Sequence, residues 1–170
     1  YSVPMDVKLQ SLFWIFAEAL FVILLGLRCI EKGNKASKIL AMIGLGFGVL
    51  SVILQIALIC ELFPYMESRG FFSYAPTTMG KITLFATFTM AVMICGALVS
   101  RIKNSEKLVN LLKIIALSTG GGFWLIITIL IFMSDSQNSS KLLSIGKIFL
   151  SCFFVCWITA LIMSKFGKKD

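Results

Sequence analysis

The chain has 170 residues, of which 58% are hydrophobic and only 14% are charged, and its mean hydropathy is +0.95. Soluble domains usually contain about 45–50% apolar and about 25% charged residues, so this composition excludes a disordered chain, a disulfide-stapled secreted module and a soluble nucleic-acid binder. The chain contains no histidine, which excludes histidine-ligated haem, histidine-containing zinc sites and Ser-His-Asp triads. Its formal net charge is +8. The positions of the basic residues indicate that this charge reflects the orientation of the chain in a membrane and not binding to nucleic acid.

Five stretches are long and apolar enough to cross a bilayer, and we take residues 1–170 as a single transmembrane domain. A spanning helix needs about 20 mainly apolar residues to cross about 30 Å of hydrocarbon. The stretches are continuous and do not alternate as the strands of a barrel do, so the sequence predicts an all-α bundle of five transmembrane helices. The predicted spans are residues 9–29, 39–61, 82–100, 109–133 and 142–164.

Basic residues gather on one side of these spans. Eleven of the 16 Lys and Arg residues flank the first and third connections or lie in the C-terminal tail, and the other five lie on the opposite side. The positive-inside rule therefore predicts an external N-terminus and a cytoplasmic C-terminus. A chain that begins at Tyr1 on the outer side is expected to have lost a signal peptide or a further span, or to have been trimmed.

The two connections on the outer side differ in composition. The longer one, residues 61–81, is rich in aromatic residues, which prefer the headgroup level of a bilayer. We expect it to lie along the interface, either as an ordinary aromatic belt or as a lid over an outward cavity. The shorter one contains the glycosylation sequon Asn138-Ser139-Ser140.

Glu18, in the first span, is the residue that most strongly indicates a function. It lies near mid-depth, where an ionised side chain costs several kcal/mol, so the carboxyl must be protonated, paired or exposed to water. A site for a proton, a cation or a polar substrate group is one interpretation. A structural hydrogen bond to a neighbouring helix is the other.

The second span offers the best partner surface for Glu18. Gly44, Gly48, Ser51 and Gln55 are spaced by four, three and four residues, so they share one face of a helix. Small residues let two helix backbones approach closely, and polar residues can form hydrogen bonds across the contact. We predict that this face packs against the first span and that Ser51 or Gln55 forms a hydrogen bond with Glu18.

The third and fourth spans add further candidates. Thr87 lies in the outer half of the third span, one turn after Thr83, and threonines in apolar helices often bond to their own backbone. In the fourth span, Gly120, Gly121 and Gly122 follow one another, and each costs about 1 kcal/mol relative to alanine in a helix. This run predicts either close helix packing or a broken helix of the kind that lines transporter sites.

Two residues near the cytoplasmic edge are expected to reach the membrane surface. Cys29, beside Arg28, is a candidate for palmitoylation. Lys113 lies near the start of the fourth span, where a long side chain can extend to water. We also expect the basic edge to attract anionic lipids.

Two classes of function fit a multi-pass integral membrane protein of this kind. The first is a transport component, or one that binds a small molecule or an ion, with an outward-open cavity lined by Glu18, Ser51, Gln55 and Thr87. The second is a non-catalytic structural or assembly subunit, which would bind a membrane-protein partner or further copies of itself. We expect neither a cofactor nor a metal site, and no enzyme activity, because a lone carboxylate without histidine or an activated nucleophile offers little chemistry.

Overall fold

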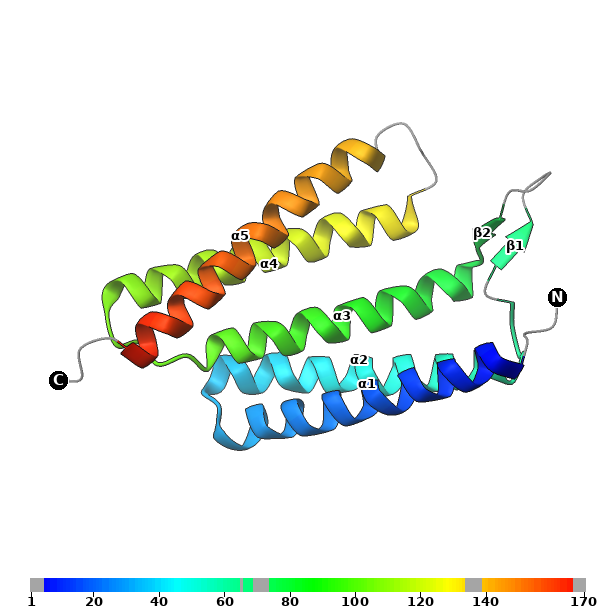
Figure 1. The fold of residues 1–170 in the computed structure, drawn as a ribbon, viewed down its shortest axis with the longest axis horizontal. Helices are drawn as coiled ribbons and strands as arrows, with labels where there is room; N and C mark the ends of the chain where they lie inside the picture. The colour runs from blue at the N-terminus through cyan, green and yellow to red at the C-terminus, as the bar shows by residue number, and fades with distance from the viewer. Residues whose placement is uncertain (1–4, 65, 69–73, 134–138, 167–170) are drawn as a thin grey trace.

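The computed structural model describes residues 5–64, 66–68, 74–133 and 139–166. Within these residues the chain forms five long helices and one short hairpin (Figure 1). The helices are α1 (Met5–Lys32), α2 (Lys35–Ile59), α3 (Thr78–Ser100), α4 (Lys107–Phe132) and α5 (Ser139–Phe166). Each is long and apolar enough to cross a membrane, which confirms the predicted architecture of five apolar helices.

The helices run a few residues past the predicted spans at most of their ends, but α2 stops early. Its last helical residue is Ile59, and Glu61 follows with a φ of 59°. The amides of Glu61 and Leu62 return to carbonyls in the last turn of α2, both at 3.0 Å, as in a Schellman motif. Glycine is usual at this left-handed position, but this chain has Glu61. The side chain of Glu61 takes part in an ion pair, because its Oε1 lies 3.6 Å from Lys8 Nζ of α1. This ion pair joins the start of α1 to the end of α2.

The helices form two parts of unequal size (Figure 1). α1, α2 and α3 contact one another, whereas α5 packs mainly against α4. α3 also contacts α4. α3 therefore belongs to the first part, and the second part packs against it. In the view of Figure 1, α5 crosses α4.

Burial is concentrated where α3 meets its neighbours. Three buried clusters follow it along the bundle, made of Val22, Met90 and Ile94, of Cys29, Ala41 and Ala97, and of Val99, Ala116 and Phe153. Cys29 is fully buried within the second of these clusters. This burial contradicts the expectation that Cys29 accepts a palmitoyl chain, because its thiol packs against α2 and α3 and not at the surface.

A hairpin that the sequence analysis did not predict lies between α2 and α3. Its strands, β1 (Met66–Ser68) and β2 (Tyr74–Pro76), pair in antiparallel register. Thr77 closes the connection, because its hydroxyl donates to the carbonyl of Pro64 at 2.6 Å and accepts from an amide in the first turn of α3. Asn138 of the sequon lies outside the described residues.

Candidate functional site

Glu18 lies halfway along α1, on the face that packs against the rest of the bundle. The thirteen residues between the start of the helix and Glu18 correspond to about 20 Å at 1.5 Å per residue. Ile15 and Val22, three residues before it and four after it, are both buried. Their spacing places the half-buried Glu18 on the same face.

Two side chains of α2 form hydrogen bonds with the carboxyl of Glu18. Ser51 Oγ lies 2.7 Å from Glu18 Oε1, and Gln55 Nε2 lies 2.6 Å from Oε2. Gln55 Nε2 also donates to Ser51 Oγ at 2.8 Å. The sequence predicted a hydrogen bond from one of these two residues, and both form one.

Thr87 of α3 completes the group. Its Oγ1 lies 2.6 Å from Ser51 Oγ and donates to the carbonyl of Thr83 at 3.0 Å. Thr83 donates in the same way to the carbonyl four residues before it, as expected of threonines in an apolar helix. Three helices therefore contribute to one continuous polar group, which we call the Glu18 cluster: Glu18, Ser51, Gln55 and Thr87.

The glycines of α2 allow this close approach. A Cβ added at Gly48 would lie 2.9 Å from Val22 of α1, and one added at Gly44 would lie 2.9 Å from Ile94 of α3. The predicted packing against the first span is therefore only half of the contact, because the same face of α2 also packs against α3. Ser51, on this face, is fully buried and reaches both neighbours.

The Glu18 carboxyl is held by neutral groups. Within the described ranges, the ion pair that forms joins Lys8 and Glu61 at the end of the helices, not Glu18. Those ranges also contain no group of three or more His, Cys, Asp or Glu residues that could hold a metal ion. A hydroxyl and an amide group are thus the hydrogen-bond partners of the carboxyl.

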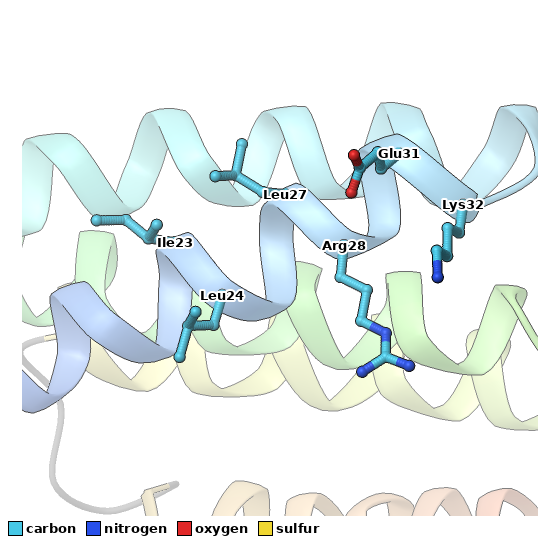
Figure 2. A pocket seen from close by; sticks show the side chains of 6 residues that line it. All are labelled: Ile23, Leu24, Leu27, Arg28, Glu31 and Lys32. Atoms are coloured by element: carbon cyan, nitrogen blue, oxygen red, sulfur yellow. The ribbon is translucent and has the colours of Figure 1, made fainter.

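Two hollows lie away from the Glu18 cluster. One is an apolar cavity of about 270 Å³ between α3, α4 and α5. The other is a shallow depression on α1, where Figure 2 shows apolar side chains on the earlier turns and charged ones near the helix end. It is lined by Ile23, Leu24, Leu27, Arg28, Glu31 and Lys32. Neither hollow is lined by a member of the Glu18 cluster, so neither is the outward-open cavity expected from the sequence.

The glycine run of α4 does not break the helix. α4 is continuous through Gly120, Gly121 and Gly122, which contradicts the broken-helix interpretation and leaves close packing as the alternative. A Cβ added at Gly120 would lie 3.1 Å from the ring of Phe153, and one at Gly122 would lie 3.4 Å from the ring of Phe149. These two glycines therefore make room for aromatic rings of α5, while Gly121 faces open space.

Lys113 of α4 is a buried ionisable residue, although the sequence analysis expected its side chain to extend to water. Its side chain is only 7% exposed, and its Nζ donates to the carbonyl of Ile102 at 2.6 Å and to Asn104 Oδ1 at 2.9 Å. The expectation that it extends to water is wrong, because the connection after α3 supplies both acceptors. The sequence shows a polar Asn104 in the short connection before α4, but the other acceptor is a backbone carbonyl, which no residue pattern marks.

A comparison of the chain with protein-family models, with curated proteins and with solved structures found no significant match in any of the three. The functional assignment therefore rests on the geometry of the Glu18 cluster.

Proposed function

We propose that this chain is a multi-pass integral membrane protein that binds an ion or a small polar group at the Glu18 cluster, as a transport or ligand-binding component. One observation carries the proposal: the carboxyl of Glu18 lies halfway along an apolar helix and is bonded by side chains of a second helix that contact a third. Ionisable residues at this depth are costly and typically mark ion pathways or ligand sites.

We also propose that the N-terminal end of the bundle faces outward. In Figure 1 the α1–α2 connection, the α3–α4 connection and the end of α5 lie at one end of the molecule, and the hairpin lies at the other. Basic residues of the described chain gather at the first of these ends: Arg28, Lys32, Lys35, Lys38, Arg101, Lys103, Lys107 and Lys165. The positive-inside rule favours a cytoplasmic location for that end.

Ion flux into liposomes that contain the purified chain tests this function. Indicator dyes for protons, sodium and potassium report the flux after a concentration gradient is imposed. We expect Glu18→Gln to lower the flux by at least about tenfold, because glutamine keeps the shape and hydrogen bonds of the site but can neither bind a cation nor exchange a proton. Circular dichroism and gel filtration should show unchanged folding.

Glu31→Gln is the matched control, because it removes a carboxyl at the end of the same helix. Its flux should equal that of the wild type. Equal flux through wild-type and Glu18→Gln vesicles would contradict a role of Glu18 in transport.

The second candidate function is that of an assembly subunit, and the exposure of α4 favours it. Only 6% of the most apolar 18-residue stretch of α4 is buried, against 39% for α3. Native mass spectrometry after extraction in a mild detergent separates the two candidates. A stoichiometric protein partner would favour the subunit, whereas a lone chain or homo-oligomer that carries a small molecule or lipid would favour the binding function.

A further inference from the structure

We infer that the ion bound by the Glu18 cluster is a proton, held on Glu18 as a neutral carboxylic acid. This inference rests on the proposed function and names the ligand of that site. The argument is a count of the hydrogens that the contacts of the cluster require.

Three oxygen–oxygen contacts run through the cluster in series. Glu18 Oε1 lies 2.7 Å from Ser51 Oγ, Ser51 Oγ lies 2.6 Å from Thr87 Oγ1, and Thr87 Oγ1 lies 3.0 Å from the carbonyl oxygen of Thr83. Each hydrogen bond needs one hydrogen, but with an ionised carboxyl the two hydroxyls supply only two. A proton on Oε1 supplies the third. The acid then donates to Ser51, Ser51 donates to Thr87, and Thr87 donates to the Thr83 carbonyl.

Gln55 supplies the other hydrogen bonds that the oxygens of Glu18 and Ser51 accept. Its two amide hydrogens go to Glu18 Oε2 and to Ser51 Oγ. Ser51 then accepts two hydrogen bonds and donates one, which is the full capacity of a hydroxyl. With an ionised carboxyl, Thr87 must turn its hydrogen to Ser51 and give up the bond to the Thr83 carbonyl. The complete set of contacts therefore requires the protonated acid.

The short distances favour a proton over a metal ion. Two ligands that lie about 2.4 Å from a cation, at right angles to each other, are about 3.4 Å apart. The successive oxygens of Glu18, Ser51 and Thr87 are 2.7 and 2.6 Å apart, which is the range of O–H···O hydrogen bonds. As placed, these oxygens are spaced for hydrogen bonds with one another and would have to separate to share a cation.

Charged groups on the three helices lie too far along their axes to compensate an ionised Glu18. The nearest along each helix are Lys8 and Arg28 on α1, Glu61 after α2, and Lys81 on α3. Each lies at least six residues from the cluster member on its own helix, which is about 9 Å or more along the axis. Lys8 and Glu61 are already paired with each other. A bound proton removes the charge that these groups leave uncompensated.

The bound proton also links helices. As an acid, Glu18 of α1 donates to Ser51 of α2, which frees the Ser51 hydrogen for Thr87 of α3. When the proton leaves for water, the charge on the carboxylate draws the Ser51 hydrogen back to Oε1. Protonation thus changes the contact between α2 and α3, as a proton-coupled transport step requires.

Infrared spectroscopy of the wild-type chain in liposomes tests the inference. Glu18 is the one residue among the eight acidic residues that lies in the interior of a predicted span, since the other seven lie near helix ends, in connections or at the C-terminus. We expect the C=O stretching band of one protonated carboxyl per chain at neutral pH, shifted in D₂O and lost as the pH is raised. The absence of this band at neutral pH would overturn the inference.

Three variants assign the band. Glu18→Gln should remove it, and Glu31→Gln should leave it unchanged. Gln55→Met keeps the acid but removes the donor to Oε2, so the band should move to higher frequency. A band that responds to neither Glu18→Gln nor Gln55→Met belongs to another carboxyl and overturns the inference, and Gln55→Met retains this power where Glu18→Gln does not fold.

The infrared experiment tests the bound proton and the flux experiment tests transport, so a negative result in one does not imply a negative result in the other. Glu18-dependent cation flux without the band contradicts the proton and leaves the ion-binding function intact. The band without any flux supports the proton and contradicts transport.

Discussion

The two parts of the bundle are held together by different chemistry. α1, α2 and α3 are joined midway by the Glu18 cluster. At the α1–α2 connection they are joined by Asn34, whose side-chain amide donates to the carbonyl of Ser100 at 2.7 Å. α4 and α5 meet instead through aromatic rings laid on glycines, as where Phe153 lies over Gly120. The first part is tied by directional polar contacts between helices, and the second by apolar packing.

This difference matters more in a membrane than in water. Lipid tails are as apolar as the helix surfaces, so helices associate through packing and hydrogen bonds and not through the hydrophobic effect. A hydrogen bond between two helices requires particular residues to face each other. The packing of an aromatic ring over a glycine allows the two helices to shift slightly along each other. The proposed response to protonation therefore concerns the contacts among α1, α2 and α3, and not the packing of α4 against α5.

Two polar contacts join the parts. Trp124 Nε1 of α4 donates to Thr89 Oγ1 of α3 at 2.9 Å, and Lys113 of α4 binds the connection that follows α3. The apolar cavity of about 270 Å³ lies beside this joint. The hydrogen bonds of Trp124 and Lys113 thus attach α4 and α5 to α3 beside this apolar cavity.

The largest effect should come from forcing apart the helices of the first part. Gly48→Leu places a side chain where even a Cβ would lie 2.9 Å from Val22, and overpacking typically costs about 1–3 kcal/mol or more. We expect a clear fall in the midpoint of thermal unfolding in detergent. A Cβ added at Gly46 on the same helix would meet nothing within 4 Å, so Gly46→Leu should unfold at the wild-type midpoint or somewhat above it, because leucine favours a helix over glycine. Equal midpoints for the two variants would show that α2 is not packed as described.

An intermediate effect is expected at the joint between the parts. Lys113→Met removes the donor to the carbonyl of Ile102 and to the side chain of the exposed Asn104. The buried bond is the one to Ile102, and a buried acceptor left without a partner costs about 1–3 kcal/mol. Lys107→Met, at the exposed start of the same helix, should change stability by less than about 0.5 kcal/mol. Denaturant titration in detergent micelles measures both. If Lys113→Met is as stable as Lys107→Met, the hydrogen bonds of Lys113 contribute nothing to the joint.

Much of the Glu18 cluster could be predicted because helix periodicity alone determines which residues share a face. The spacing of Gly48, Ser51 and Gln55 selects one face of α2, and counting from the outer boundary places Ser51 at the depth of Glu18. Both steps need only straight helices of known ends. The binding of a ligand at the cluster stays a prediction.

Other features depend on information that periodicity does not carry. The partners of Lys113 include a backbone carbonyl in a connection, and no residue pattern encodes the path of that connection. The glycine run of α4 could have been a break or a packing surface. The outcome depends on which face of α5 turns Phe149 and Phe153 toward it, and the glycine run by itself does not say which face of α5 it meets.

The smallest predicted effect distinguishes neighbouring glycines in that run. Gly121→Ala should stabilise the chain by up to about 1 kcal/mol, because alanine favours the helix and the added methyl meets nothing within 4 Å. Gly120→Ala gains the same helix propensity but sets its methyl 3.1 Å from the ring of Phe153, so its net effect should be near zero or slightly unfavourable. Thermal unfolding of the two variants side by side measures the difference. Equal stabilisation by both would mean that Phe153 moves away from the added methyl at little cost. Equal destabilisation would contradict the open space found beside Gly121.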